Sequence, residues 1–147
     1  MAGGHGPPAP AVGTPTGTAR PPGTAPPTPE AETIGTAGTY YALVDRADPR
    51  HGTLTVDVVQ FFTGAPAARA CAQDGVPDQH GLLCHAYYLR DRSLRLTTLR
   101  VRPDAVTAGC GSSRPSTFRR APPARHDLVR LGVARGVVTR LDEICLP

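Results

Sequence analysis

The sequence contains no Lys, no Asn and no Trp, and aromatic residues make up only 5% of its 147 positions. All sixteen basic side chains are therefore Arg, in a chain also rich in Ala, Gly and Pro, a combination typical of high-GC codon usage. Because codon usage explains the arginines, a cluster of them is a weak indicator of function. The net charge of +4 favours anionic partners only mildly and does not by itself favour nucleic acid.

Long apolar runs are absent as well. No stretch approaches the roughly 18–20 apolar residues that a membrane-spanning helix needs, so we expect no transmembrane segment. Residues 1–5 lack the basic start and apolar stretch of a signal peptide. If the protein is exported, we expect that a leader or lipid anchor preceded Met1 or was trimmed.

Residues 1–37 differ in composition from the rest of the chain. They hold nine of the 17 prolines, and Val12 and Ile34 are their only large aliphatic residues apart from Met1. Such a segment buries too little apolar surface to offset its ordering entropy, which predicts a disordered, extended tether. Residues 38–147 then form a single domain. Because tethers of this kind commonly precede exported domains, we expect a secreted or cell-surface protein.

An even number of cysteines in a small domain indicates disulfides, and four cysteines allow three connectivities. The four are Cys71, Cys84, Cys110 and Cys145. The loop between the first two contains Gly75, Pro77 and Gly81, which lets it turn tightly enough to close. We therefore favour the first cysteine paired with the second and the third with the fourth. Two disulfides would brace a domain whose core is limited by its size.

Zinc binding is one alternative for these cysteines, because His80 and His85 lie near Cys71 and Cys84. The spacing matches no usual structural zinc pattern, since the chain has no C-x-x-C pair. A set of buried, reduced thiols is a third possibility, and it requires a cytoplasmic location. We expect neither a metal nor another cofactor.

Alternating apolar residues predict strands over 40–45 and 53–59, joined as a hairpin, followed by a helix over 63–73 that carries Cys71. Gly75 suits a left-handed helix C-terminus. Four further strands are predicted, over 85–90, 94–101, 128–133 and 137–144. A flexible loop is expected at 109–126. This order predicts an α+β fold, a small and mostly antiparallel sheet of five to six strands with one short helix. A partly closed barrel, as in oligonucleotide/oligosaccharide-binding folds, is one arrangement of it.

Several segments carry a resemblance to a known family. They are residues 55–64 (Thr-Val-Asp-Val-Val-Gln-Phe-Phe-Thr-Gly), Ala70-Cys71, Asp74-Gly75, Cys84, Tyr87-Tyr88-Leu89-Arg90 and residues 136–143 (Gly-Val-Val-Thr-Arg-Leu-Asp-Glu). With them the chain resembles a group of uncharacterised actinobacterial proteins that are secreted or lipid-anchored. The resemblance implies an extracytoplasmic location and a shared fold, and it implies no activity. Cys110 and Cys145 lie outside its pattern, and Asp91 stands where the group commonly has Asn.

Candidate catalytic groups are few. Asp142 and Glu143 are adjacent on a predicted strand, so their side chains point to opposite faces and cannot act as a couple. Ser112 and Ser113, with His126 and Asp127, supply the side-chain types of a hydrolase triad, but no G-x-S-x-G nucleophile elbow is present. We expect no catalytic site and predict that the protein is not an enzyme.

Tyrosines on predicted strands and arginines in the long loop are the best candidates for a binding surface. The candidates are Tyr41, Tyr87, Tyr88, Arg90, Arg119 and Arg120. The favoured hypothesis is a non-catalytic, extracytoplasmic binding domain whose partner is an unidentified protein or envelope component. The alternative is a small barrel-like module that binds a polyanion or nucleic acid through its arginines, with nucleic acid the less favoured of the two.

Overall fold

The computed structural model of the protein describes residues 3–4, 33–77, 83–111 and 114–147. Most of the predicted tether (residues 1–2 and 5–32) lies outside the described residues, as do His80 and the serines at 112 and 113. Within the described residues the chain forms seven strands and one helix. They are β1 (Gly38–Asp48), β2 (Thr53–Thr63), α1 (Gly64–Gln73), β3 (Tyr87–Arg90), β4 (Leu96–Ala108), β5 (Ser116–Thr117), β6 (Leu128–Ala134) and β7 (Val137–Glu143).

Five of these strands close into a barrel. Around the barrel β1 pairs with β2, β2 with β4, β4 with β7, β7 with β6, and β6 returns to β1. All of these pairings are antiparallel except β4 with β7, which is parallel. β3 and β5 are extra strands on β2 and β4. The predicted α+β class, with a small, mostly antiparallel sheet and one short helix, is confirmed, and the barrel is closed.

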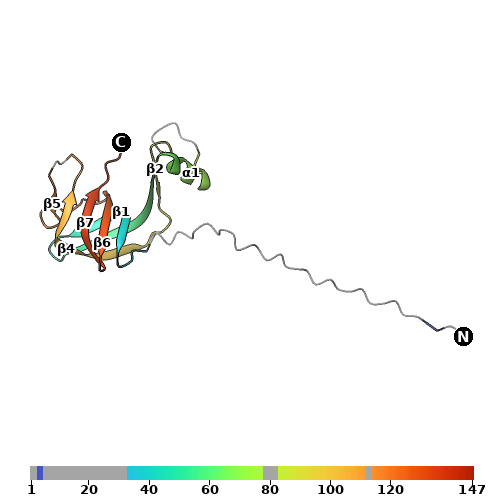
Figure 1. The fold of residues 1–147 in the computed structure, drawn as a ribbon, viewed down its shortest axis with the longest axis horizontal. Coiled ribbons are helices and arrows are strands. Elements are labelled where there is room, and N and C mark those ends of the chain that lie inside the picture. The colour runs from blue at the N-terminus through green and yellow to red at the C-terminus, as the bar shows by residue number, and fades with distance from the viewer. Residues whose placement is uncertain (1–2, 5–32, 78–82, 112–113) are drawn as a thin grey trace.

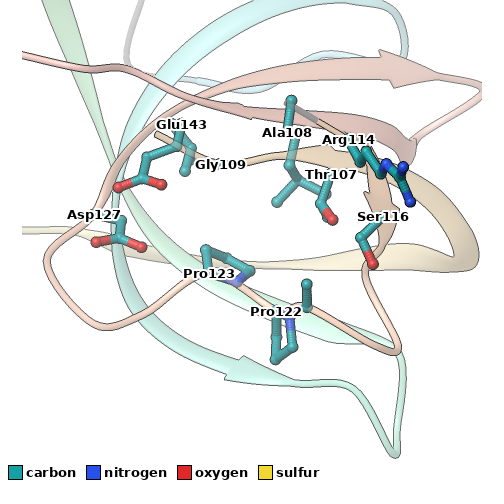
Figure 2. A pocket seen from close by; sticks show the side chains of 12 residues that line it. Thr107, Ala108, Gly109, Arg114, Ser116, Pro122, Pro123, Asp127 and Glu143 are labelled. Atoms are coloured by element: carbon teal, nitrogen blue, oxygen red, sulfur yellow. The ribbon is translucent and has the colours of Figure 1, made fainter. Parts of the chain in front are cut away.

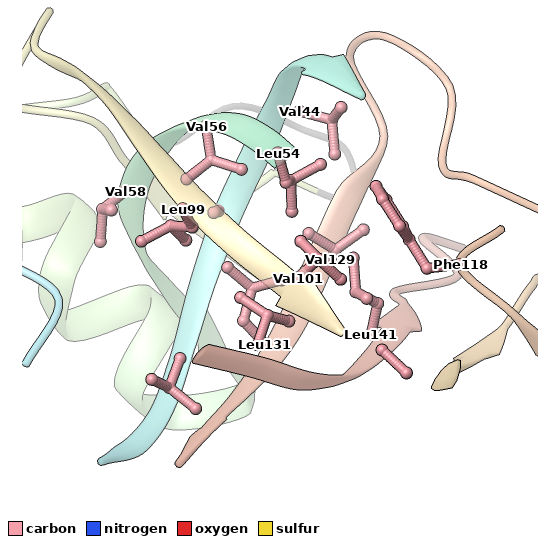
Figure 3. Packing of buried hydrophobic residues seen from close by; sticks show 14 residues of the cluster. Val44, Leu54, Val56, Val58, Leu99, Val101, Phe118, Val129, Leu131 and Leu141 are labelled. Carbon is pink, nitrogen blue, oxygen red and sulfur yellow. The ribbon is translucent and has the colours of Figure 1, made fainter. Parts of the chain in front are cut away.

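The hydrophobic core fills the barrel (Figure 3). On β2 the alternate residues Leu54, Val56 and Val58 point inward and are at most 2% exposed. Leu131 and Leu141 face them from β6 and β7. The period-two alternation in the sequence therefore marks the inner wall of the barrel correctly.

Beyond Val59, β2 leaves the barrel and rises toward α1 (Figure 1). There its last residues pair with β3, from Gln60 with Arg90 to Thr63 with Tyr87. This projecting unit of residues 60–77 and 83–90, made of the β2 end, α1 and β3, is called the arm below. The helix ends as predicted, with Gly75 at φ +67°, a conformation that costs glycine little.

Both disulfides of the favoured pairing are present. Cys71 on α1 bonds Cys84 just before β3, and both residues are buried, at 3% and 5% exposed. Cys110 after β4 bonds Cys145 after β7, and this bridge is exposed. The first bridge fastens the arm and the second fastens the C-terminal segment to the barrel. No helix among the described residues is long and apolar enough to cross a membrane.

The described part of the 109–126 segment, where the sequence suggested a flexible loop, makes contacts with the barrel. Phe118 is fully buried in the barrel core, and its backbone N–H donates to the Ala105 carbonyl at 2.9 Å. Just before it, β5 pairs with the end of β4. One large aromatic side chain therefore anchors a stretch whose other described residues are mostly polar or small.

The folded domain begins a few residues earlier than the expected boundary at 38. Ile34 packs against the core, and the Gly136 N–H donates to the Thr36 carbonyl at 2.7 Å. The Tyr40 hydroxyl accepts from the Gly35 N–H at 3.0 Å. Residues 34–37 are therefore part of the domain, and a tether would end before them.

Candidate functional site

The two faces of β3 have different surroundings, because successive side chains on a strand point to opposite sides. On one face Tyr87 lies beside Phe61, with ring centroids 6.4 Å apart, and Phe61 lies 5.4 Å from Tyr41 on β1. These three half-buried rings form a continuous patch on the outside of the barrel and arm, called the aromatic surface below. It borders a hollow of about 310 Å³ lined by Tyr41 and Phe61.

On the other face of β3, Tyr88 and Arg90 turn toward α1. Arg90 Nε donates to Asp74 Oδ2 at 2.7 Å, and the Tyr88 hydroxyl donates to the same oxygen at 2.9 Å. Arg92 donates to Asp74 Oδ1 at 2.7 Å. The Arg90 guanidinium also lies over the Phe62 ring, 5.1 Å from its centroid. This cluster around Asp74 is called the Asp74 brace.

The electrostatics of the Asp74 brace follow from these contacts. The Arg90 hydrogen bond, with help from Arg92 and Tyr88, lowers the pKa of Asp74 to about 2, against the desolvation that would raise it. Burial, and then the hydrogen bond to Asp74, raises the pKa of Tyr88. The Asp74 carboxylate is therefore charged at neutral pH, and two guanidinium groups of the same fold neutralise it.

The predicted binding residues consequently fall into separate places. Tyr41 and Tyr87 share the aromatic surface, whereas Tyr88 and Arg90 belong to the Asp74 brace. Arg90 is only 11% exposed and holds the arm together. Arg119 and Arg120 are both exposed, and only Arg119 lines a groove.

That groove lies at the end of the barrel where β1 turns into β2. It has a volume of about 440 Å³ and is called the basic groove. Its lining residues are Pro49, Arg50, His51, Gly52, Arg100, Val101, Arg102, Pro103, Arg119 and Val137. A hydrogen bond from the Val101 N–H to the Gly52 carbonyl, 2.8 Å long, fixes the β1–β2 turn against β4.

The arginines of the basic groove differ from those of the arm in their partners. Arg102 pairs with Asp104 at 2.9 Å, and both side chains are more than half exposed. Arg50, Arg100 and Arg119 make no ion pair with any residue of the described segments. The groove therefore presents positive charge at these three arginines that no carboxylate of the described segments neutralises.

The order of the barrel strands relates the position of the basic groove to that of known ligand sites in similar barrels. The barrel strands β1, β2 and β4 are consecutive neighbours, and β6 returns to lie beside β1, which is a Greek-key order. Five-stranded Greek-key barrels of the oligonucleotide/oligosaccharide-binding type hold ligands on their second and third strands and adjoining loops. By this analogy of architecture, the corresponding face here comprises β2, β4 and the β1–β2 turn, and the last two of these line the basic groove.

A smaller pocket of about 240 Å³ opens at the side of the barrel that the 114–127 segment covers (Figure 2). It is called the barrel-end pocket. Thr107 and Ser116 approach it on one side, with Arg114 near them, and the carboxylates of Asp127 and Glu143 lie on the other (Figure 2). The hydroxyl of Thr107 has no hydrogen-bond partner within the described part of the chain, although the residue is only 8% exposed.

The candidate catalytic groups are not assembled into a couple. Asp142 bonds Arg140 at 2.9 Å and Arg130 at 3.2 Å, whereas Glu143 accepts from the Cys110 N–H. Burial opposes these arginines, which nevertheless lower the pKa of Asp142. His126 is exposed, and the serines proposed beside it at 112 and 113 lie outside the described residues. In the described segments no three His, Cys, Asp or Glu residues gather to hold a metal.

Sequence reasoning missed two features of these sites. Arg100 and Arg102 alternate on β4 with the buried Leu99 and Val101, so their outward direction was readable from the period-two pattern. That Arg100 and Arg102 lie beside Arg50 could not be predicted from the sequence, because this proximity depends on closure of the barrel. Thr107 carried no signal, since an isolated threonine on a strand is ordinary.

No family model, no curated protein sequence and no solved structure matches this chain.

Proposed function

We propose that the protein is a non-catalytic binding domain of an oxidising, extracytoplasmic compartment and that its ligand is an anionic polymer of the cell envelope. The observation that carries the proposal is the basic groove, in which Arg50, Arg100 and Arg119 have no carboxylate partner among the described residues. The two disulfides support the compartment, because such bonds persist where the surroundings are oxidising and are rare in the cytosol.

The side chains of the groove indicate the chemistry of the ligand. Guanidinium groups bind phosphate and carboxylate oxygens with two parallel hydrogen bonds. Thr53 on β2 pairs with Arg100, and the Thr55 and Thr98 hydroxyls beside them share a hydrogen bond of 3.0 Å on the same outer face, which leaves one of the two hydroxyls to donate to the same groups. Together these residues suit a chain of repeating phosphate or carboxylate groups.

Single-stranded nucleic acid is the less favoured polyanion. Proteins that bind it combine a positive groove with aromatic side chains on which the bases stack. No Phe or Tyr occurs among the described residues that line the basic groove. A polymer without bases fits this lining better than an oligonucleotide does.

The proposal is tested by titrating the full chain with three polymers: a glycerol-phosphate oligomer, polygalacturonate and dextran. We expect the two anionic polymers to bind, and their affinity to fall steeply between about 50 and about 200 mM salt as counterions compete. Dextran carries no charge and should not bind the basic groove. Anionic binding that does not depend on salt, or no anionic binding at all, would contradict the proposal.

Matched arginine variants locate the site. Arg50→Ala and Arg100→Ala should each weaken anionic binding severalfold and reduce the salt slope, because each removes one contact to the polymer. Arg69→Ala is the control, since Arg69 is exposed on α1 and its removal changes the net charge equally. Equal losses from Arg69→Ala and Arg100→Ala would mean that general attraction to a basic protein, and not the groove, holds the polymer.

The compartment is tested separately by intact mass after thiol alkylation, on protein exported to an oxidising compartment. Without prior reduction we expect no alkylation, and after reduction we expect four alkylated thiols, one for each cysteine. Four free thiols before reduction would contradict both disulfides and remove the support they give to an extracytoplasmic compartment, whatever the result of the polymer titrations.

The aromatic surface supports a second candidate function, which is binding of a neutral envelope glycan. Tyr41, Phe61 and Tyr87 offer flat apolar rings with polar edges beside two shallow hollows, the hollow of about 310 Å³ and another of about 400 Å³ that Tyr87 lines. Binding of dextran that is lost in Tyr87→Ala to the same extent at low and high salt would support this candidate. Absence of dextran binding would remove it.

A further inference from the structure

The barrel-end pocket reaches down to the hydrophobic core of the barrel. Its floor includes Val129 and Leu141, which are 1% and 2% exposed members of the core. Pro122 and Pro123 of the 114–127 segment lie across from Thr107 and close another side (Figure 2). With about 240 Å³ of space, the pocket accommodates a molecule of amino-acid size.

Thr107 brings an unsatisfied polar group into this pocket. The residue is 8% exposed, and its Oγ1 atom has no hydrogen-bond partner in the segments that the structure describes. Its hydroxyl oxygen is itself covered and lies near Ser116 at the wall of the pocket (Figure 2). Because a buried hydroxyl without a partner is destabilising, and valine has the same shape, a threonine here indicates a ligand that bonds to it.

The carboxylates on the opposite side of the pocket also lack cationic partners. Asp127 Oδ2 accepts from the Ala124 N–H at 2.7 Å, and Glu143 Oε2 accepts from the Cys110 N–H at 2.9 Å. These backbone contacts fix the direction of the two carboxylates but do not neutralise them. Neither carboxylate has an ion pair within the described part of the molecule.

This lack of partners contrasts with four other carboxylates of the described segments. Elsewhere in the described segments, arginines pair with Asp45, Asp74, Asp104 and Asp142. Asp127 and Glu143 share one pocket and stay unpaired, although Arg114 lines that pocket on the side away from them (Figure 2). The pocket therefore has a negative side and a side with hydroxyls and a guanidinium.

From this division we infer that the barrel-end pocket binds a small zwitterion with an ammonium group at one end and a carboxylate at the other, as in straight-chain ω-amino acids. The ammonium lies against Asp127 and Glu143, and the carboxylate accepts hydrogen bonds from Thr107 and Ser116 and faces Arg114. The methylene chain packs on Leu141 and Pro123. This site is separate from the basic groove and does not depend on the polymer-binding proposal.

The test uses the full chain and a set of soluble probes followed by amide chemical shifts of the pocket residues. The probes are β-alanine, γ-aminobutyrate and ε-aminocaproate, with butylamine and butyrate as single-ended controls. We expect one chain length to bind best, in the millimolar range or tighter, because the two charged sides are a fixed distance apart. Each single-ended control should bind at least about tenfold more weakly, since it loses one of the two ends.

Three variants assign the contacts. Asp127→Asn and Glu143→Gln keep an oxygen for the backbone N–H that each carboxylate bonds, and remove only the charge. Each should weaken the best probe about tenfold and leave butyrate binding unchanged. Thr107→Val should also weaken it several-fold, while the melting temperature of the unliganded protein stays equal or rises, because no hydrogen bond is lost.

Thr139→Val is the matched control on the neighbouring strand β7. The Thr139 hydroxyl is satisfied, donating to the Gly132 carbonyl at 3.3 Å, so this variant should lower the melting temperature and leave probe binding unchanged. A lower melting temperature for Thr107→Val with unchanged probe binding would show that Thr107 is purely structural and overturn the inference. Absence of shifts at the pocket with every probe at ten-millimolar concentration would overturn it equally.

Discussion

The arginines near one end of strand β2 have carboxylate partners, whereas those near the other end do not. At the arm end, Arg90 and Arg92 converge on Asp74, and both pair with its carboxylate within the fold. At the turn end, Arg50 and Arg100 lie in the basic groove with no carboxylate partner in the described segments. The contrast teaches that arginine content says little about function here, whereas the pairing of each arginine separates a structural role from a contact role.

The largest expected effect is the loss of stability on removing the disulfide of the arm. Replacing Cys71 and Cys84 together by Ala should lower the free energy of unfolding by about 3 kcal/mol, and more than replacing Cys110 and Cys145. The first bridge is buried and fastens α1 to the arm, whereas the second is exposed. Denaturant unfolding of both double variants measures the difference.

Loop entropy alone predicts the reverse order, because the first bridge closes 13 residues of sequence separation and the second 35. Equal losses, or a larger loss for the exposed bridge, would therefore show that restriction of the unfolded chain outweighs packing in the arm.

The next effect concerns Arg90 itself. Arg90→Ala should lower the free energy of unfolding by about 2 kcal/mol, because it removes the main partner of an 86%-buried carboxylate and uncovers the Phe62 ring. Arg90→Lys keeps the charge but loses the planar fork and should recover only part of the loss. Urea midpoints provide the measurement, and full recovery by Lys would mean that charge alone matters.

The stability that Asp74 contributes at the arm end should depend on pH. The pKa of Asp74 falls from 3.8 to about 2 in the folded protein, mainly through the Arg90 hydrogen bond. Its contribution to stability, about 1–2 kcal/mol, is therefore complete above about pH 4 and is lost as the pH falls toward about 2. Unfolding of the wild type and Asp74→Asn should differ at neutral pH and converge in acid. A constant difference across this range would exclude the carboxylate charge as the cause.

The smallest expected effect on stability is that of removing Arg100, near the end of β2 that adjoins the β1–β2 turn. Arg100→Ala should change the free energy of unfolding by less than about 0.5 kcal/mol, because Arg100 is exposed and makes no ion pair in the described segments. The same variant should weaken binding of the anionic polymers. A stability loss as large as that of Arg90→Ala would mean that the two ends of β2 do not differ in the way described.

Much of the fold was predictable where local chemistry decides it. The β1–β2 hairpin and the turn at Arg135 and Gly136, with φ of 52° and 74°, follow from alternation and glycine placement. The parallel pairing of β4 with β7 was not predictable, because it joins segments far apart in sequence and arises only when the barrel closes. Phe118 was missed for a related reason, since its polar neighbours hide a residue that fills the barrel.

The candidate sites were predictable only in part. Alternation places Tyr87 and Tyr88 on opposite faces, yet it does not say which face α1 covers, and the position of Asp74 decides that. The basic groove combines the β1–β2 turn, β4 and Arg119, three segments that only the three-dimensional fold brings together.

The double pairing of β1 has a mechanical consequence. β1 is hydrogen-bonded to β2 along one edge and to β6 along the other, its first residue Gly38 follows the N-terminal segment, and the basic groove lies just past its last residue. Tension between an attachment on the N-terminal side and a polymer held at Arg100 on β4 therefore passes from β1 to its neighbours through both ladders, roughly along the strand axis. Such a load shears both ladders at once instead of opening them one hydrogen bond at a time, and the domain should resist pulling in this direction more strongly than across it.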